Sequence, residues 1–476
     1  MWRAHSSGFD CLRLTGSLTA SVTEAPGARP PLLVLLACAR DRVLLAHPCF
    51  TLLPLNMSRF LLTVWPLGTH LNPFLSVALA LRQRGHEVAF YTGAAVIDSV
   101  RTQGFRCFPF QAVDDARVDQ AFRDLATGSW RPSRWQELML GTVPEQLRDL
   151  EDVWKSWKPD AVVCDMAMWG PILVLHELKA VPVALLSHVA SCILPGPEHP
   201  VPGMNWLLKG TPLRLIADPV AWIMRTASLA VPRAANRLRQ GWGVPPLSGT
   251  VTEFTGTLPL YLVPGTPAFD GARRDLPPSV RYVGPCLLDK DRDQPVAIWI
   301  STVARDVPRV MVWEGSLYPE KPVLLQMAAR GLANLPLNVV LITGEGRSVA
   351  SLNLGPLAPN IHIQKWTPLI DVLHVADVLV AGGDSETVMA SLERKLPMVL
   401  VPTILDQPEM SWLVSKAGAG LRIPRWKCSP KRLAAAVSRV LTEPQFRDNA
   451  ARLSDDFREY TGADLAARLL EKMTAR

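Results

Sequence analysis

Residues 60–92, FLLTVWPLGTHLNPFLSVALALRQRGHEVAFYT, carry the clearest signal of the fold class. This segment begins with a short apolar run, Phe60–Trp65, which is typical of a buried strand. It ends with a second such run, Glu87–Thr92, and between the two runs apolar residues recur at helical spacing. A strand, a helix and a strand in this order form a βαβ unit, so we expect a parallel sheet with helices on both faces.

Both ends of the helix in this unit carry local signals. Asn72 is predicted to be its N-cap, with Pro73 at the first helical position, where the missing N–H of proline costs nothing. Gly85 is predicted to end the helix in the left-handed conformation. Residues 66–71 then form a loop between the strand and the helix.

The same alternation continues along the chain in two series. Further strands of the first series are predicted at Ala161–Asp165, Val181–Leu186 and Leu258–Val263. Strands of the second series are predicted at Arg309–Trp313, Leu337–Thr343, Ile361–Ile363, Val378–Ala381 and Met398–Val401, with helices near 321–333, 385–395 and 408–417 and a helical tail over 430–475. We therefore expect an α/β fold of two Rossmann-like domains, whose parallel sheets face a central cleft and bind ligands at the carboxyl ends of their strands.

The domain boundaries are predicted from the local composition of the chain. The segment before Met57 is expected to lie outside the fold, as a disordered leader or a misplaced start, because Met57 stands directly before the first strand. Pro264–Pro295, dense in proline, glycine and charge, is interpreted as an interdomain linker. The expected regions are an extension, an N-terminal domain, a C-terminal domain and a C-terminal helix, at 1–56, 57–290, 296–455 and 456–476.

The composition also limits the class of function. The formal net charge of +7 is a mild basic excess, and no block of Lys and Arg is interleaved with aromatic residues, so nucleic acid is not an expected partner. The eight cysteines form no CxxC pair, and no His cluster has zinc spacing, which favours reduced thiols in the cytoplasm and no metal site. No apolar run is long enough to cross a bilayer.

Residues 192–255, rich in Pro, Trp and Arg, have two interpretations. The plainer one is a set of helices of the first domain with a solvated basic face. The alternative is a peripheral contact with a membrane, because Trp222 and Trp242 alternate with basic residues such as Arg237 and Arg239, as in interfacial helices.

Two polar residues stand at carboxyl ends of strands in the first half. His70 follows the first strand, and the N–H groups of the predicted helix would keep its ring uncharged, and therefore a base, at neutral pH. Asp165 ends another strand of the same sheet, so both side chains open onto one crevice. A carboxylate there orients the ring and stabilises its charged form, as the acid of a catalytic triad does. We therefore favour His70 as a general base with Asp165 as its orienting acid. The plainer interpretation is that His70 is structural and Asp165 caps the helix that follows it.

The second half has loops suited to a phosphorylated ligand. Glycines between a strand and a helix let a diphosphate approach the backbone, and the helix N-terminus supplies N–H donors. A carboxylate beside an amide suits vicinal sugar hydroxyls, and an indole ring suits a nucleobase. The candidates are Gly315, Ser316, Trp366, Gly382, Gly383, Ser385, Thr387, Asp406 and Gln407, each of which has a plainer interpretation as a turn, cap or core residue.

These pieces, in this order, resemble the GT-B glycosyltransferases of the family that includes UDP-glycosyltransferases and bacterial macrolide and rhamnosyl transferases. The segment PLGTHLNP at 66–73, followed by RGHEV at 84–88, is similar to the opening motif of that family. YVGP at 282–285 is similar to its interdomain segment. WTP at 366–368 and DQP at 406–408 are similar to the two ends of its donor-binding motif.

The resemblance implies an inverting transfer of a sugar from a nucleotide-sugar donor to a hydroxyl of a small or lipophilic acceptor. His70 is then the general base, Asp165 its orienting acid, and the N-terminal domain binds the acceptor. The nucleotide-diphosphate sugar is a co-substrate, and no cofactor or metal is implied. Asp291-Arg292-Asp293 looks like the metal-binding motif of other transferases, but it lies in the charged linker and is assigned to solvent.

The loop from Gly382 to Ala390 departs from the family. In an ungapped match the phosphate-binding His of the family falls on Gly382, and the Glu that holds ribose hydroxyls falls on Ala390. Asp384 and Glu386 bring acidic side chains near a dianion, and like unit charges about 4 Å apart repel by roughly 1–4 kcal/mol. This departure leaves two alternatives open: a catalytically impaired GT-B protein that acts as a partner or activator of another enzyme, and a GT-B sugar-nucleotide epimerase.

Overall fold

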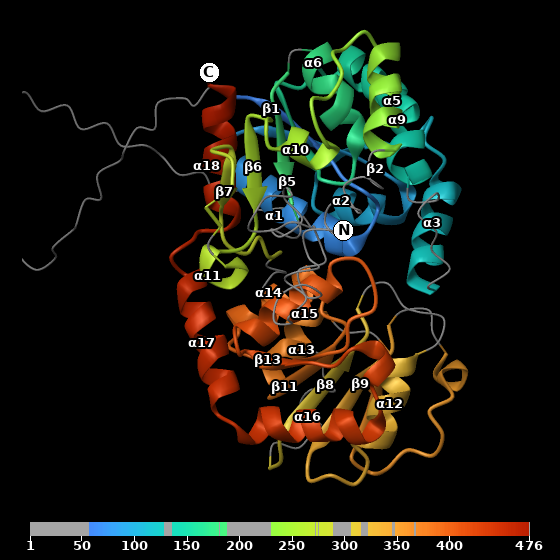
Figure 1. The fold of residues 1–476 in the computed structure, drawn as a ribbon, viewed down its shortest axis with the longest axis vertical. Helices are drawn as coiled ribbons and strands as arrows, with labels where there is room; N and C mark the ends of the chain where they lie inside the picture. Colours follow the sequence, from blue (N-terminus) through green and yellow to red (C-terminus); the bar gives the residue numbers. More distant parts are fainter. Residues whose placement is uncertain are drawn as a thin grey trace, which may run out of the picture. The chain divides into compact units, whose positions relative to one another are not determined.

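Two parallel sheets, each covered by helices, make up the described part of the chain (Figure 1). The computed structural model describes residues 57–127, 136–179, 181–187, 230–271, 273–274, 276–288, 306–315, 322–344, 348–365 and 368–475. The predicted α/β fold with two Rossmann-like sheets is confirmed. The expectation for residues 1–56 concerns a segment outside the described residues and stays a prediction.

The first sheet has seven parallel strands in the order β3-β2-β1-β4-β5-β6-β7. They are β1 (Arg59–Thr63), β2 (Glu87–Thr92), β3 (Arg106–Pro109), β4 (Ala161–Asp165), β5 (Val183–Leu186), β6 (Leu260–Val263) and β7 (Val280–Tyr282). These strands are nearly continuous apolar runs because helices cover both faces of a parallel sheet. β1 lies between β2 and β4, with Thr63 opposite Cys164, so the segments that follow β1 and β4 begin side by side.

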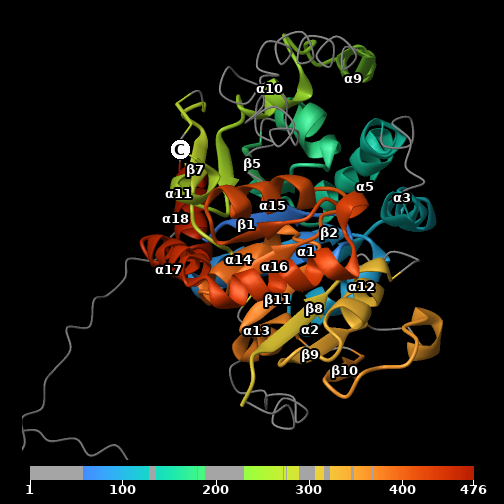
Figure 2. The ribbon, with the colours of Figure 1, turned by 60° about the horizontal axis from the view of Figure 1, so that its bottom comes forward.

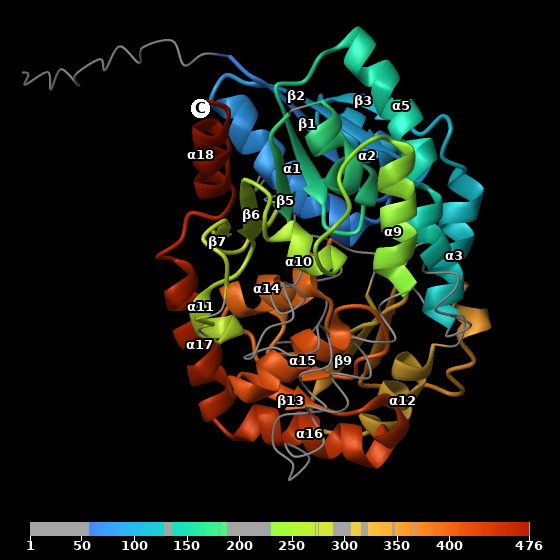
Figure 3. The same cartoon turned by 45° about the horizontal axis from the view of Figure 1, so that its top comes forward.

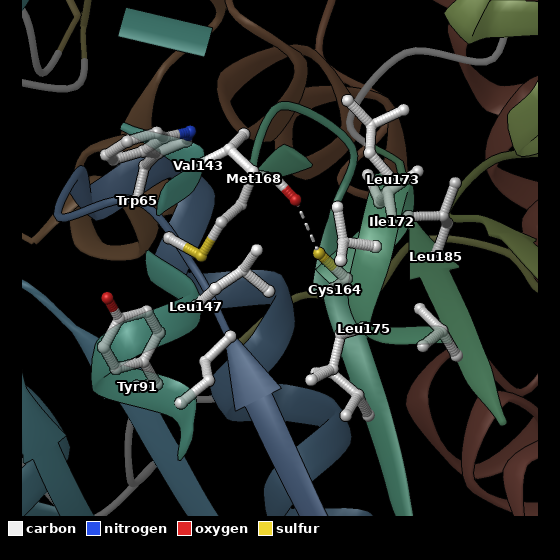
Figure 4. Close-up of a cluster of buried hydrophobic side chains, with 14 of the residues drawn as sticks. Trp65, Tyr91, Val143, Leu147, Cys164, Met168, Ile172, Leu173, Leu175 and Leu185 are labelled. Carbon is white, nitrogen blue, oxygen red and sulfur yellow. Dashed lines mark hydrogen bonds between the residues drawn. The ribbon is translucent and has the colours of Figure 1, made fainter. Parts of the chain in front are cut away.

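Successive residues of β1 point into two different cores. Phe60 and Leu62 pack in one core with α1, whereas Leu61 packs in the other with α5 and η3. Figure 4 shows the second core around Cys164, whose Sγ donates to the carbonyl oxygen of Met168 at 3.1 Å. The helical segments of this half are α1 (Gly68–Gln83), η1 (Ala94–Val96), α2 (Ile97–Thr102), α3 (Asp115–Thr127), η2 (Glu137–Gly141), α5 (Val143–Ser156), η3 (Pro171–Leu175), α6 (His176–Leu178), α9 (Ala230–Gly241), α10 (Val251–Thr255) and α11 (Pro267–Asp270).

The second sheet has six parallel strands in the order β10-β9-β8-β11-β12-β13. They are β8 (Arg309–Trp313), β9 (Asn338–Ile342), β10 (Ile361–Gln364), β11 (Val378–Ala381), β12 (Met398–Leu400) and β13 (Gly420–Arg422). Helices α12 and α16 cover one face, as Figure 2 shows, and α13, α14 and α15 cover the other. The helical segments are α12 (Val323–Gly331), η6 (Val349–Leu352), α13 (Leu369–Val375), α14 (Ser385–Glu393), α15 (Gln407–Lys416), η7 (Arg425–Lys427) and α16 (Pro430–Thr442).

The last two helices pack on different sheets. α17 (Gln445–Phe457) contributes Phe457 to the core beneath α14, whereas α18 (Ala463–Thr474) buries Leu470 in the core of the first sheet. α18 lies beside α1 (Figure 3), and Oε1 of Glu471 accepts from Arg84 Nε at 2.7 Å and lies 2.9 Å from His86 Nε2. The C-terminal helix is therefore part of the N-terminal half in space.

The predicted start of α1 is wrong. The helix begins at Gly68, and Pro73 lies inside it rather than at its first position. The carbonyl of Leu67 accepts the N–H groups of His70 and Leu71, so the first turn forms without a side-chain cap. The Asn72 amide bonds to another helix instead. Gly85, with φ of 90°, does have the predicted left-handed conformation after the helix.

The interpretation of Pro264–Pro295 as a linker is also partly wrong. Its described portion contains α11 and β7, and β7 pairs with β6 as the last strand of the first sheet. Val280 and Val283 are buried, which explains why this proline-rich segment is ordered structure. The part that includes Asp291–Asp293 lies outside the described residues.

The membrane interpretation of 192–255 gains no support from its described part. Residues 192–229 lie outside the described residues. Arg239 is not a surface charge, because it is 1% exposed and its guanidinium pairs with Glu177. Among the helices that the structure describes, none is long and apolar enough to cross a bilayer.

Candidate active site

The side chains of His70 and Asp165 meet at the carboxyl edge of the first sheet. His70 lies in the first turn of α1, and Asp165 is the last residue of β4. Nδ1 of His70 is 2.7 Å from Oδ2 of Asp165. The Asp165 carboxylate is fully buried, and its Oδ1 accepts from the backbone N–H of Ala167 at 2.9 Å, which fixes its orientation. The structure thus brings together the two residues that the sequence paired.

The surroundings of His70 favour its charged form. Burial lowers the pKa of the imidazole, but the carboxylates of Asp165 and Asp406 raise it by more, so its pKa lies above the ordinary 6.5. The sequence predicts that the helix N-terminus disfavours the charged ring, whereas the neighbouring carboxylates act in the opposite direction and favour it. A ring in these surroundings holds a transferred proton firmly.

The N-terminus of α14 carries a carboxylate of its own. Asp384 is the N-cap, and its Oδ1 accepts the backbone N–H of Thr387 at 3.0 Å. Its Oδ2 accepts the hydroxyl of the same Thr387 at 2.9 Å. Burial raises the pKa of Asp384, and the hydrogen bonds from Thr387 partly offset this. Asp384 therefore engages two of the donors that the sequence assigned to phosphate.

A second carboxylate reaches the same helix end from another loop. Oδ2 of Asp406, in the loop after β12, accepts the backbone N–H of Ser385 at 2.7 Å. Burial and the neighbouring charge of Asp384 raise the pKa of Asp406 to about 6. The end of α14 that would attract an anion is thus occupied by Asp384 and Asp406.

Gln407 packs closely against the glycine loops. Its Oε1 accepts the backbone N–H of Thr403 at 2.9 Å and the Thr403 hydroxyl at 2.8 Å. A Cβ added to Gly382 would lie 3.0 Å from Nε2 of Gln407, and one added to Gly315 would lie 3.3 Å from Oδ2 of Asp384. Gly315 and Gly383 also have φ of 96° and 91°, which side chains disfavour. Glycine is needed at these positions for close packing and for backbone geometry.

A pocket opens at the carboxyl ends of β8, β11 and β12. Its lining residues are Glu314, Val323, Leu324, Gly382, Val401, Thr403, Arg425 and Cys428. The Glu314 carboxylate accepts the backbone N–H of Leu324 at 3.2 Å, so α12 also has an acidic side chain at its start. Arg425 is exposed and makes no ion pair with any other described residue, so it brings positive charge to a site rich in carboxylates.

The two halves meet through Asn72 of α1 and Glu386 of α14. Nδ2 of Asn72 donates to Oε1 of Glu386 at 2.5 Å. Sequence reasoning missed this contact and Arg425. Asn72 was interpreted as a cap, and no local signal connects it to a carboxylate 314 positions away.

Comparison with known proteins agrees with this architecture. Residues 330–471 match the family described as "Erythromycin biosynthesis protein CIII-like, C-terminal domain". The chain is 29% identical to 4'-demethylrebeccamycin synthase of Lentzea aerocolonigenes over 84% of this chain and 96% of that protein. It is 25% identical to demethyllactenocin mycarosyltransferase of Streptomyces fradiae, over 87% and 86% of the two chains. The crystal structure of the glycotransferase of kitacinnamycin superposes with a TM-score of 0.68 at 22% identity, over 88% of this chain and 99% of that one.

These matches support a family 1 glycosyltransferase with the GT-B fold. The chain is a glycosyltransferase that depends on a nucleotide-sugar donor. The relatives give no support to the two alternatives, a partner protein and an epimerase. Among the described residues of this glycosyltransferase, no group of three His, Cys, Asp or Glu side chains is placed to hold a metal ion.

Two predicted donor contacts of this glycosyltransferase lie outside the described residues. These are Ser316 and Trp366. The remaining predicted contacts come from the carboxyl ends of β8, β11 and β12 in one sheet, as a nucleotide-binding α/β domain requires. They are Gly315, Gly382, Gly383, Ser385, Thr387, Asp406 and Gln407.

Proposed function

We propose that this glycosyltransferase inverts the anomeric centre of its donor sugar, with His70 as general base. The observation that carries the proposal is the 2.7 Å contact between His70 Nδ1 and Asp165 Oδ2. It leaves Nε2 as the ring nitrogen that takes the proton of the acceptor hydroxyl. The oxygen then attacks the anomeric carbon as the bond to the diphosphate breaks, and Asp165 stabilises the imidazolium.

On the donor side, we assign sugar hydroxyls to Asp406 and Gln407, and the diphosphate to the backbone at Gly315, Gly382 and Gly383. Glycine supports this assignment because it lets phosphate oxygens approach the main chain. Ser316 remains in the proposed donor site as a phosphate contact, and Trp366 as the platform for the base. Ser385 and Thr387 belong to the same site, although carboxylates engage their donors in this structure.

The leaving diphosphate needs positive charge because carboxylates occupy the helix ends. Arg425 supplies it in our proposal, since its side chain lines the same pocket as Gly382. A guanidinium suits this role because it forms bidentate hydrogen bonds with phosphate. No metal ion or cofactor enters the proposed reaction, and the nucleotide-diphosphate sugar is a co-substrate.

The proposed acceptor is a hydroxyl of a small or lipophilic molecule. The names of the two relatives, a rebeccamycin synthase and a mycarosyltransferase, support natural-product acceptors. Peripheral contact with a membrane through residues 192–255, in an otherwise cytoplasmic protein, stays a prediction. Flotation with anionic liposomes tests it, and a protein that stays at the bottom of the gradient contradicts it.

The deciding experiment measures donor binding and turnover separately. A thermal-shift panel of UDP, dTDP and their glucose and rhamnose conjugates identifies the nucleotide. Release of that nucleotide is then followed for the wild type and His70→Ala with a panel of phenolic and alcoholic acceptors. We expect His70→Ala to lose turnover by roughly 10²–10⁴-fold while the nucleotide still raises its Tm.

Full turnover by His70→Ala contradicts the assignment of the base. If no nucleotide or nucleotide sugar raises the Tm of the wild type, the donor assignment is wrong and a binding role without transfer gains support.

A further inference from the structure

The hydrogen bond between Asn72 and Glu386 joins the two helices that carry the opposite sides of the reaction. Nδ2 of Asn72 donates to Oε1 of Glu386 at 2.5 Å, across 314 positions of sequence. Asn72 lies on α1, two positions after His70. Glu386 lies in the first turn of α14, two positions after Asp384. The bond therefore lies next to the proposed base on one side and the donor loop on the other.

Other features show that the two halves approach each other at this point. The charge of Asp406, in the loop before α15, raises the pKa of His70 together with Asp165. Further along α1, the hydroxyl of Ser76 donates at 2.9 Å to the carbonyl oxygen of Leu287, whose side chain packs against the core of the second sheet. Of these contacts, the one between Asn72 and Glu386 is a direct side-chain hydrogen bond from α1 to α14.

An acidic residue at position 386 of a glycosyltransferase weakens donor binding by electrostatic repulsion, because a dianionic diphosphate must bind nearby. Glu386 directs its carboxylate to the amide of Asn72, so the acidic group has a partner on the opposite half. A neutral residue that only accepts a hydrogen bond would avoid the repulsion. The carboxylate instead gives the stronger, charge-assisted hydrogen bond, which favours a structural purpose for this side chain.

We propose that Asn72 and Glu386 are a positioning pair that sets the distance between His70 and the anomeric carbon of the donor. The proposal rests on the assignment of His70 as the base. Attack by the acceptor oxygen requires reacting atoms about 3–3.5 Å apart, and a displacement of about 1 Å can lower the rate by about 10²-fold. A bond that holds α1 against α14 beside the base fixes that distance.

The test is a double-mutant cycle with a conservative variant. Glu386→Ala and Asn72→Ala remove the bond, and we expect each to lower kcat by about 10–100-fold. The double variant should be no slower than either single one, because both remove the same contact. Glu386→Gln keeps an oxygen that accepts from Asn72, so its kcat should stay within a few-fold of wild type. Its affinity for the nucleoside diphosphate should rise because a negative charge is lost.

Glu393→Ala is the matched control, because Glu393 is a partly exposed glutamate at the other end of α14 whose carboxylate pairs with Arg394. It should leave kcat and donor affinity unchanged. Hydrogen–deuterium exchange adds a second readout: residues 68–83 and 385–393 should exchange faster in Glu386→Ala than in wild type, with little change in Tm.

Three results overturn the proposal: wild-type kcat in Glu386→Ala and Asn72→Ala, additive losses in the double variant, or an equal loss in Glu386→Gln and Glu386→Ala. His70→Ala is measured alongside. If it is inactive while the alanine variants of the pair are fully active, only the positioning role fails. If His70→Ala is itself active, the proposed base is wrong.

Discussion

Oδ2 of Asp406 accepts the backbone N–H of Ser385 at 2.7 Å, so a carboxylate from the loop after β12 occupies the N-terminus of α14. Burial, together with the nearby charge of the buried Asp384 carboxylate, raises the pKa of Asp406 to about 6. A raised pKa means that the folded protein holds the proton more firmly than the unfolded chain. The charged form of Asp406 therefore opposes folding in full above pH 6, and this cost declines as the pH falls from 6 towards the ordinary pKa of 3.8, below which it is gone.

Asp406→Asn should raise the Tm at pH 7.5, because the amide oxygen still accepts from Ser385 and the buried charge is gone. The gain should shrink at pH 5, where Asp406 is protonated in the wild type. The same variant should lose transfer activity, since we assign the carboxylate to sugar hydroxyls. Differential scanning calorimetry at the two pH values checks the first part, and an equal gain at both refutes it.

Asp165→Asn should lower kcat by roughly 10²–10⁴-fold, because the imidazolium loses its stabilising charge. Asp165 raises the pKa of His70, so its removal should lower that pKa. The acidic limb of the kcat–pH profile should then move to lower pH in the variant. A limb that stays in place would show that His70 is not the group that titrates.

Gly382→Ala should weaken donor binding by about 10-fold, because overpacking displaces neighbouring side chains. The new Cβ would lie 3.0 Å from Nε2 of Gln407, whose Oε1 is held by Thr403. Gly241→Ala is the matched control, since a Cβ there meets no atom within 4 Å. Calorimetric titration with the nucleoside diphosphate compares the two, and equal affinities would contradict the assignment of this loop.

Arg425→Ala should raise the KM for the donor by about 10–100-fold with a smaller effect on kcat, as expected for the loss of a charge-assisted hydrogen bond. Arg425→Lys should recover part of the loss because the charge remains. Lys431→Ala, an exposed cation at the start of α16, is the control for a general change in charge. A KM for Arg425→Ala equal to that of the control excludes contact with the phosphates.

The strands were the most predictable part of the fold. Glu87–Thr92, Ala161–Asp165, Arg309–Trp313 and Val378–Ala381 have the bounds that the sequence predicts. A strand buried on both faces must be apolar throughout, so it can be recognised from its own consecutive residues. β7 was missed because Val280–Tyr282 is only three residues long and lies in a proline-rich segment.

The start of α1 shows where local reasoning fails. Asn72 and Pro73 form a familiar helix-start signal, yet the helix begins at Gly68. The Asn72 amide has a better partner in Glu386 of another helix, and Leu67 supplies a backbone acceptor for the first turn. A capping signal depends on the side chain bonding to its own helix, and a contact from a distant segment overrides it.

The pairing of His70 with Asp165 follows from the sequence, because both residues stand at carboxyl ends of strands in one parallel sheet and all such ends open on the same edge. The surroundings of the donor loop, in contrast, depend on how distant segments pack together. Asp384 and Asp406 cap α14 where phosphate was expected, and Glu386 turns to Asn72. The reason is physical: strand ends follow from local patterns, whereas the partner of a buried carboxylate depends on which segments the fold brings together.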